Sequence, residues 1–170
     1  MVISLDEYLS TVYEPDCEYA EGELVERNAG DLDHCGLLVI IAALLYNQRL
    51  QHGIHVFPML RIQVSATRCR IPDITVTTQK VRTRILREPA FLCVEILSPE
   101  DRASRMQTKI DDYLSFGVHH VWIIDPREPK GWSYTREGKR QSTEVLTTSD
   151  PLLTLTLGEV FEALSEAGEE

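Results

Sequence analysis

Two isolated carboxylates stand in stretches that otherwise have the composition of buried β-strands. Asp73 follows Pro72 at the head of the β-branched run IPDITVTT, and Glu95 lies in the middle of the apolar segment AFLCVEILS. An ionised carboxylate in such surroundings is costly unless it is paired or bound to a cation. If the two strands are neighbours, the carboxylates converge and repel each other unless one is protonated or a cation lies between them. Such hard oxygen ligands suit Mg²⁺ or Mn²⁺, which keep several waters and favour phosphate oxygens.

Each carboxylate also has a purely structural explanation. Pro-Asp pairs are common at turns, and a buried glutamate can simply pair with an arginine. Pro72 suits a strand edge or a bulge, and a bulge re-aims the side chain that follows it. The two acids alone therefore leave a metal site and a structural ion pair both open.

A lysine on the next predicted helix adds a third element. In the segment RASRMQTKIDDYLSFG, apolar residues four apart form the inward stripe: Met106, Ile110 and Leu114. Lys109 occupies the adjoining stripe, between Arg105 and Tyr113. Its ammonium group could point at the two carboxylates, although a lysine beside an apolar face often extends to solvent instead. We assign no chemistry to Tyr113.

The elements that must position these groups follow from periodicity and turn residues. Ser4 and Glu7 have the capping-box spacing of a helix start, and CEYAEGELVER is predicted to form two short strands around a Glu-Gly turn. Apolar residues from His34 to about Leu50 recur at helical spacing, which predicts a long buried helix. The segment AFLCVEILS is apolar on both faces, as a central strand covered by helices would be.

The remaining segments complete an α/β pattern. IHVFPMLRIQV, IPDITVTT and HHVWIID are predicted strands, and Ser98, Pro99 and Asp101 fit the N-cap, N1 and N3 positions of the helix that runs to Phe116. GWSYTRE and TEVLTT suggest a peripheral hairpin, and TLGEVFEALSEAG a last short helix. This order predicts a single α/β domain over residues 1–170, with a central mixed β-sheet flanked by helices on both faces.

Composition limits the class of protein and its cellular location. The 170 residues are 43% hydrophobic and 26% charged, as in an ordinary folded domain. The first residues, MVISLDEYLS, lack a basic stretch before an apolar one, and the longest apolar run is about half of what a bilayer crossing requires. We therefore expect no membrane association and a cytoplasmic location. The cysteines are scattered without C-x-x-C spacing, which argues against zinc and for reduced thiols: Cys17, Cys35, Cys69 and Cys93.

Charge is spread unevenly along the chain. The formal net charge is −10, which argues against a generally basic surface for nucleic acid. Between Arg61 and Ala90, however, seven basic residues stand against two acids, which gives a local net of about +5. This stretch is either a local basic face or a solvated loop that carries arginines.

At this point the sequence resembles the Uma family of restriction endonucleases, a branch of the PD-(D/E)XK nuclease superfamily. The likeness covers residues 19–126 and rests on six segments kept in order: YAEGELVE, the helix that His34 opens, IPDITV, VEILSPE, TKIDDYLSFGV and VWIIDP. His34 stands where the family often has histidine, although a histidine there can equally bond a loop. The resemblance implies a restriction-endonuclease-like fold.

The resemblance also implies site residues. Asp73 matches the first acid of the superfamily pattern and Glu95 the second, but Leu97 stands where the pattern has lysine. In Uma-type proteins a lysine on the following helix is thought to substitute, and Lys109 holds that position. Glu23 matches the acidic residue near the N-terminus, and Glu21 is the fallback for it.

The implied activity is Mg²⁺- or Mn²⁺-dependent hydrolysis of DNA. Asp73, Glu95 and Glu23 would hold the metal together with the backbone carbonyl of Ile96, and Lys109 would orient the attacking water. The basic residues between Arg61 and Arg87 would grip the DNA backbone. By analogy with the superfamily we also expect a homodimer.

Two other classes of function stay open. The first is a catalytically inactive nuclease fold that binds DNA or a protein partner, which the missing motif lysine and the acidic total charge favour. The second is another metal-dependent hydrolase or a purely structural dimer.

Overall fold

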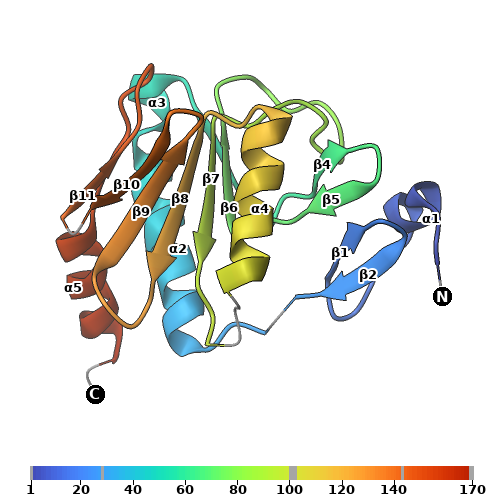
Figure 1. Cartoon of the computed structure of the whole chain (residues 1–170). Helices are drawn as coiled ribbons and strands as arrows, with labels where there is room; N and C mark the ends of the chain where they lie inside the picture. The colour runs from blue at the N-terminus through green and yellow to red at the C-terminus, as the bar shows by residue number, and fades with distance from the viewer. Residues whose placement is uncertain (1, 28, 100–102, 143, 169–170) are drawn as a thin grey trace.

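A six-stranded mixed sheet forms the centre of the molecule (Figure 1). The structure is a computed structural model that describes residues 2–27, 29–99, 103–142 and 144–168. The strand order is β10-β9-β8-β7-β6-β3, and the neighbours pair antiparallel except for β7 with β8. The strands are β3 (His55–Pro58), β6 (Ile74–Thr77), β7 (Leu92–Ile96), β8 (His120–Asp125), β9 (Lys130–Thr135) and β10 (Gly138–Ser142).

Helices cover both faces of this sheet. α2 (Leu32–Asn47) and α5 (Leu157–Gly168) pack on one face, and α4 (Ala103–Phe116) lies across the other (Figure 1). Side chains alternate along a strand, so Val94 and Ile96 of β7 join the core beneath α2 while Cys93 joins the core beneath α4. By the same alternation Glu95 points toward α4. The predicted central strand covered on both faces is confirmed.

A second sheet, antiparallel and four-stranded, carries the N-terminal hairpin. Its order is β2-β1-β5-β4, and its strands are β1 (Cys17–Ala20), β2 (Glu23–Glu26), β4 (Ile62–Ser65) and β5 (Arg68–Arg70). Helix α1 (Leu5–Ser10) packs on it through Tyr8, which is buried beside Tyr19. The predicted start of this helix is confirmed, because the Ser4 hydroxyl accepts a hydrogen bond from the Glu7 N–H at 3.1 Å.

The structure corrects two sequence-based boundaries. The helix predicted from His34 to about Leu50 ends at Asn47 and is followed by the short helix α3 (Arg49–His52). The strand GWSYTRE does not pair with TEVLTT. Instead β9 pairs with β8 and β10, while β11 (Val145–Thr147) pairs with β12 (Thr154–Thr156). Asp101, the predicted N3 residue of α4, lies outside the described residues.

The cysteines and the helices bear on two further features of the sequence. All four cysteines are free; Cys35 is exposed and the other three are buried. Burial raises the pKa of Cys69 to about 11, so this thiol stays protonated and unreactive at neutral pH. In the described part of the chain no helix combines the length and the hydropathy that a membrane crossing requires.

Candidate active site

Asp73 and Glu95 face each other across neighbouring strands. β6 and β7 pair antiparallel with Ile74 opposite Val94, so the residue before Ile74 lies opposite the residue after Val94. Both carboxylates are buried, Asp73 at 1% and Glu95 at 2% exposure. The N–H of Ile96 donates a hydrogen bond to Asp73 Oδ2 at 2.8 Å, which ties the two strands together at this point. The structure thus brings the two predicted acids together.

Lys109 reaches this pair from α4. Its Nζ lies 3.1 Å from both carboxylate oxygens of Glu95, and the Tyr113 hydroxyl donates a hydrogen bond to Glu95 Oε1 at 2.5 Å. Residues four apart lie on the same helix face, so α4 presents ammonium and phenol side by side. Burial raises the pKa of Glu95 to about 7, against the opposing effect of Lys109, and the charges of Asp73 and Glu18 add to the rise. Tyr113 is therefore part of the site, although its sequence position gave no reason to assign it chemistry.

A third carboxylate, which sequence reasoning missed, belongs to Glu18 of β1. Its Oε1 lies 3.0 Å from Lys109 Nζ and its Oε2 lies 2.9 Å from Arg70 Nη1. Glu18 is fully buried; burial would raise its pKa, but Lys109 and Arg70 outweigh burial and lower it. Burial would conversely lower the pKa of Lys109, but Glu95 and Glu18 outweigh burial and raise it. Lys109 is thus a charged bridge between acids from two different sheets.

The structure does not bring Glu23 to this cluster, which corrects the predicted N-terminal ligand. Glu23 is exposed on β2, the edge strand, opposite Ala20. It shares a face of the hairpin with Glu18, but Glu18 lies on the inner strand β1 and pairs with Lys109 of α4, whereas Glu23 lies on the edge strand. Glu21, the fallback, has a side chain that is 58% exposed and pairs with Arg68 at 3.0 Å. Glu18 had the same signal as Glu95, a lone acid between apolar residues, and that signal could have found it.

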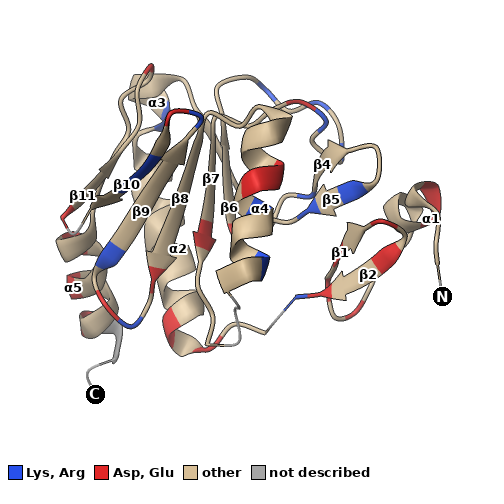
Figure 2. Cartoon of the chain, viewed as in Figure 1, with Lys and Arg blue, Asp and Glu red and all other residues tan. Residues whose placement is uncertain are grey.

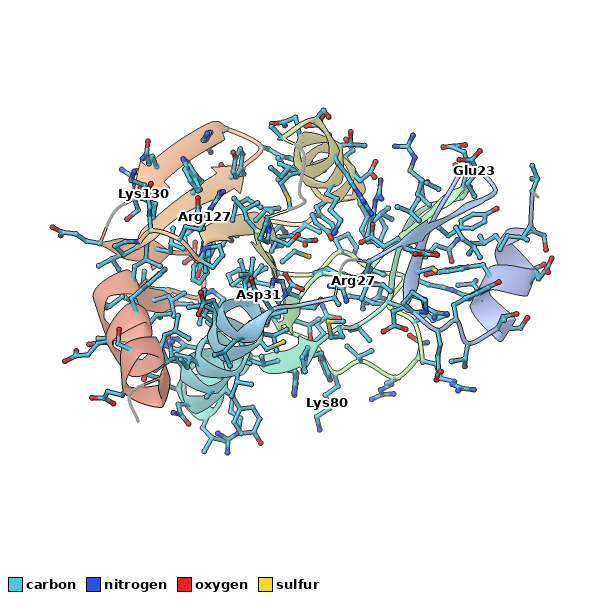
Figure 3. The ribbon with its side chains drawn as sticks, turned by 90° about the horizontal axis from the view of Figure 1, so that it is seen from below. Glu23, Arg27, Asp31, Lys80, Arg127 and Lys130 are labelled. Carbon is cyan, nitrogen blue, oxygen red and sulfur yellow. The ribbon has the colours of Figure 1, made fainter. Side chains whose placement is uncertain are left out.

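Arg27 and His34 meet the other carboxylate oxygen of Asp73. Arg27 Nη2 lies 2.8 Å and His34 Nε2 lies 3.3 Å from Asp73 Oδ1. Burial would raise the pKa of Asp73, but the bonds from His34 and the Ile96 N–H and the charge of Arg27 outweigh burial and lower it. The bond to Asp73 raises the pKa of His34 in turn. Figure 3 shows Arg27 and Asp31 on the connection into α2, where Asp31 accepts a hydrogen bond from the His34 N–H at 2.9 Å. Sequence reasoning did not identify Arg27.

A cavity of about 40 Å³ lies at this cluster, and its lining residues are Arg27, Ala29, His34, Asp73, Glu95, Ile96, Ser98, Arg105 and Lys109. Two carboxylates, those of Asp73 and Glu95, line this cavity, and Ile96 lines it beside them. Carboxylate oxygens suit a hard cation. Among the described residues no group of three His, Cys, Asp or Glu side chains is placed to hold a metal. Mg²⁺ commonly binds through one or two carboxylates and keeps waters or phosphate oxygens as its other ligands. The residues present therefore fit Mg²⁺ or Mn²⁺ in an open, two-carboxylate arrangement.

Comparison with known proteins shows the family of this chain. Residues 5–165 match the Uma2 family, whose description reads "Putative restriction endonuclease". The chain belongs to the Uma2 family. The resemblance inferred from the six segments is confirmed. No curated protein matches this Uma2 chain.

A solved structure shares the fold of this Uma2 protein. It is the crystal structure titled as a putative nuclease belonging to DUF820 from Anabaena variabilis, with a TM-score of 0.83 and 23% identity. The alignment covers 95% of this chain and 99% of that chain. The predicted fold class, a mixed sheet with helices on both faces, is confirmed.

Leu97 of this Uma2 protein lies on the same face of β7 as Glu95. It is half-buried and packs against the core beneath α4, and its N–H donates to the Ile124 carbonyl at 2.9 Å. A lysine at position 97 would extend from the strand, whereas here the ammonium group comes from α4 to the same face. The position is apolar because α4 covers it.

Six of the seven basic residues in the basic stretch of this Uma2 protein fall into two groups, and the seventh, Arg61, lies over the Tyr8 ring. Arg68 and Arg70 each form an ion pair with Asp112 of α4 at 2.7 Å, so these two arginines hold the structure together. Four others are exposed on the loop between β6 and β7, which Figure 2 shows as blue segments: Lys80, Arg82, Arg84 and Arg87. None of these four forms an ion pair with a residue that the structure describes.

This loop lies at the far end of the strands from the cavity. Asp73 precedes β6 and the loop follows Thr77, four residues along an extended strand, which is about 13 Å. The expectation that the basic residues of this stretch grip the DNA backbone stays a prediction, and the loop residues that would do so lie away from the cavity. Arg27 and Arg105 are the arginines that line the cavity.

Proposed function

We propose that this protein is a Mg²⁺-dependent endonuclease that hydrolyses DNA phosphodiester bonds. The observation that carries the proposal is the opposition of Asp73 and Glu95 on neighbouring strands, with the Lys109 ammonium group 3.1 Å from Glu95. These groups come from three separate elements and border one cavity. Membership of the Uma2 family supports the nuclease class independently.

Each residue has a defined role in this proposal. Asp73 and Glu95 would hold the cation, with the carbonyl of Ile96 as a further oxygen. A bound Mg²⁺ supplies a water of lowered pKa and offsets charge on the phosphate. Lys109 would donate hydrogen bonds to the attacking water or to the developing negative charge. Tyr113 would orient Glu95, to which it already donates a hydrogen bond.

A second candidate function is an inactive nuclease fold that binds DNA or a protein partner. One observation favours it: both oxygens of Asp73 and both oxygens of Glu95 already accept hydrogen bonds or pair with cations of the chain. The protein therefore satisfies these buried acids without a metal. Divalent-cation binding separates the two candidates.

Replacing Asp73 tests the proposed function. Asp73→Asn keeps the side-chain shape but removes the charge, so we expect Mg²⁺ affinity to fall on the order of 100-fold and plasmid nicking to disappear. Isothermal titration calorimetry measures the first effect and gel electrophoresis the second.

Asp111→Asn is the matched control, because Asp111 is exposed on α4 and bonds only to Gln107 among the described residues. It should titrate and cleave like the wild type. Identical Mg²⁺ titrations of the wild type and Asp73→Asn would contradict the site assignment. Cation binding without cleavage would instead favour the inactive module.

The proposal includes DNA as substrate and the basic loop as a second contact. The roughly 13 Å offset between loop and cavity is close to the width of the major groove of B-DNA, about 12 Å. One duplex centred on the cavity could therefore place a second backbone segment at the loop. Because one site cuts one strand, cleavage of both strands in this proposal requires a homodimer. A cytoplasmic location remains a prediction.

Removing the loop charges should weaken DNA binding in a salt-dependent way. For the triple variant Arg82→Ala, Arg84→Ala, Arg87→Ala we expect the slope of log affinity against log salt to decrease by about 2 to 3, because each phosphate contact contributes about 0.9. Fluorescence anisotropy with a labelled duplex in EDTA measures the slope without cleavage. The control removes the same charge from exposed residues of the β9–β10 hairpin: Arg136, Lys139 and Arg140. Equal loss in both triple variants would mean that total charge, not this loop, sets the affinity.

A further inference from the structure

Arg27 lies where a divalent cation and a phosphate would both have to be accommodated. Its Nη2 is 2.8 Å from Asp73 Oδ1, and only 13% of its side chain is exposed. The other carboxylate oxygen of Asp73 accepts the Ile96 N–H. Arg27, together with His34 at 3.3 Å, therefore occupies the side of Asp73 that is not committed to the β7 backbone, in the cavity that Glu95 also lines. A cation that binds Asp73 there competes with this guanidinium.

The charges around the cavity leave Arg27 without a partner once a cation binds. The lining contains two carboxylates, those of Asp73 and Glu95, together with the imidazole of His34 and three cationic side chains: Arg27, Arg105 and Lys109. A divalent cation would neutralise both carboxylates, and the cavity would then carry a net positive charge. A phosphodiester is the anion that the proposed substrate brings to this place. A guanidinium matches two phosphate oxygens with parallel N–H donors.

The local backbone keeps Arg27 at the cavity while its side chain changes partner. The N–H of Arg27 donates to the Asp16 carbonyl at 3.0 Å, and Arg105 Nη2 donates to the Glu26 carbonyl at 2.9 Å. Hydrogen bonds thus hold the end of β2 to the residue that precedes β1 and to α4. Because these bonds hold the backbone here, a change of partner would need only rotation about the side-chain bonds of Arg27.

We propose that Arg27 exchanges partners in the reaction cycle, pairing with Asp73 in the metal-free protein and with the scissile phosphate when a divalent cation occupies Asp73. The inference rests on the proposed nuclease function and adds the residue that grips the phosphate. It assigns Arg27 two opposing effects: it weakens cation binding, and it strengthens the hold on substrate. If the ion pair between Arg27 and Asp73 were purely structural, replacing Arg27 would not raise cation affinity while lowering the hold on substrate.

Arg27→Ala in the full chain separates these effects. We expect Mg²⁺ affinity, measured calorimetrically without DNA, to increase about tenfold because the competing charge is gone. We expect kcat for plasmid nicking to fall about 100-fold because a donor to the phosphate is lost. Arg27→Lys keeps the charge but not the two-pronged geometry, so its Mg²⁺ affinity should stay near the wild type and its nicking should be partly restored. Arg105→Ala is the matched control, since it removes the same charge from the cavity lining without freeing an oxygen of Asp73; its gain in Mg²⁺ affinity should be clearly smaller than that of Arg27→Ala.

The outcomes distinguish this inference from the proposed function. If the wild type binds Mg²⁺ and nicks DNA but Arg27→Ala binds Mg²⁺ no more tightly, the exchange is overturned and the nuclease assignment stands. Loss of Mg²⁺ binding in Arg27→Ala would likewise overturn it and show a structural role. If the wild type binds no divalent cation, both proposals are overturned together.

Discussion

Glu18→Gln should lower the free energy of unfolding by about 3 kcal/mol, in the range typical of breaking a buried ion pair. Glu18 is fully buried and forms ion pairs with Lys109 at 3.0 Å and with Arg70 at 2.9 Å. Glutamine preserves the shape and can still accept the Ile71 N–H, so the loss reports the charge. Arg70 and Lys109 each retain one other carboxylate, Asp112 and Glu95, which keeps the variant foldable. Urea denaturation followed by circular dichroism measures the effect.

Glu23→Gln is the matched control from the same hairpin. Glu23 is exposed, so its replacement should change stability by less than about 0.5 kcal/mol. The folded state lowers the pKa of Glu18, so its contribution is present at neutral pH and is lost as the pH falls through that lowered value. The stability gap between wild type and Glu18→Gln should therefore narrow in acid. Equal losses of unfolding free energy in Glu18→Gln and Glu23→Gln would contradict the buried, paired position of Glu18.

Lys109→Met should reduce kcat/KM for DNA cleavage by about 10² to 10³, the usual cost of losing one preorganised donor to developing charge. Methionine retains much of the aliphatic stem, so packing on α4 changes little, but Glu95 and Glu18 lose the ammonium group that they share. Plasmid nicking rates at saturating Mg²⁺ give the magnitude. Lys139→Met, on the exposed strand β10, controls for loss of a lysine elsewhere.

The pH profile of the same variant separates chemistry from structure. The pKa of Glu95 is about 7 with Lys109 lowering it, and only the ionised carboxylate holds a cation well. The kcat/KM of the wild type should therefore rise as the pH increases through about 7, since this parameter reports ionisations of the free enzyme. Without Lys109 the pKa of Glu95 rises further, and the ascending limb should move to higher pH. A lower rate with an unmoved limb would mean that Lys109 does not act on Glu95.

Much of the central site follows from local patterns. A lone acid in an apolar strand pointed to Asp73 and Glu95, and helical spacing placed Lys109 beside the inward stripe of α4. These residues meet because β6 and β7 pair antiparallel and α4, which follows β7 in the chain, packs on the same face of the sheet as Glu95. The resemblance to Uma proteins supplied the roles, including the substitution for Leu97.

The choice between acids of the N-terminal hairpin needed the tertiary structure. Glu18 and Glu23 share one face of the hairpin, and no local pattern says which strand is the edge. The pairing of β1 with β5 puts Glu18 inside, against α4, and leaves β2 in solvent. The pairing of β9 with β10 escaped prediction for a similar reason, since several polar strand-like segments near the C-terminus compete for the same partners.

The sequence by itself determined the two buried carboxylates, the lysine and the layered α/β arrangement, because strand alternation and helical periodicity act over a few residues. Tertiary structure alone decided that Glu18 rather than Glu23 joins Lys109, that Arg27 pairs with Asp73, and that the free cations of the basic loop lie at the opposite end of the sheet. Those outcomes depend on which strands become neighbours, and strand pairing is set by contacts between residues far apart in the chain.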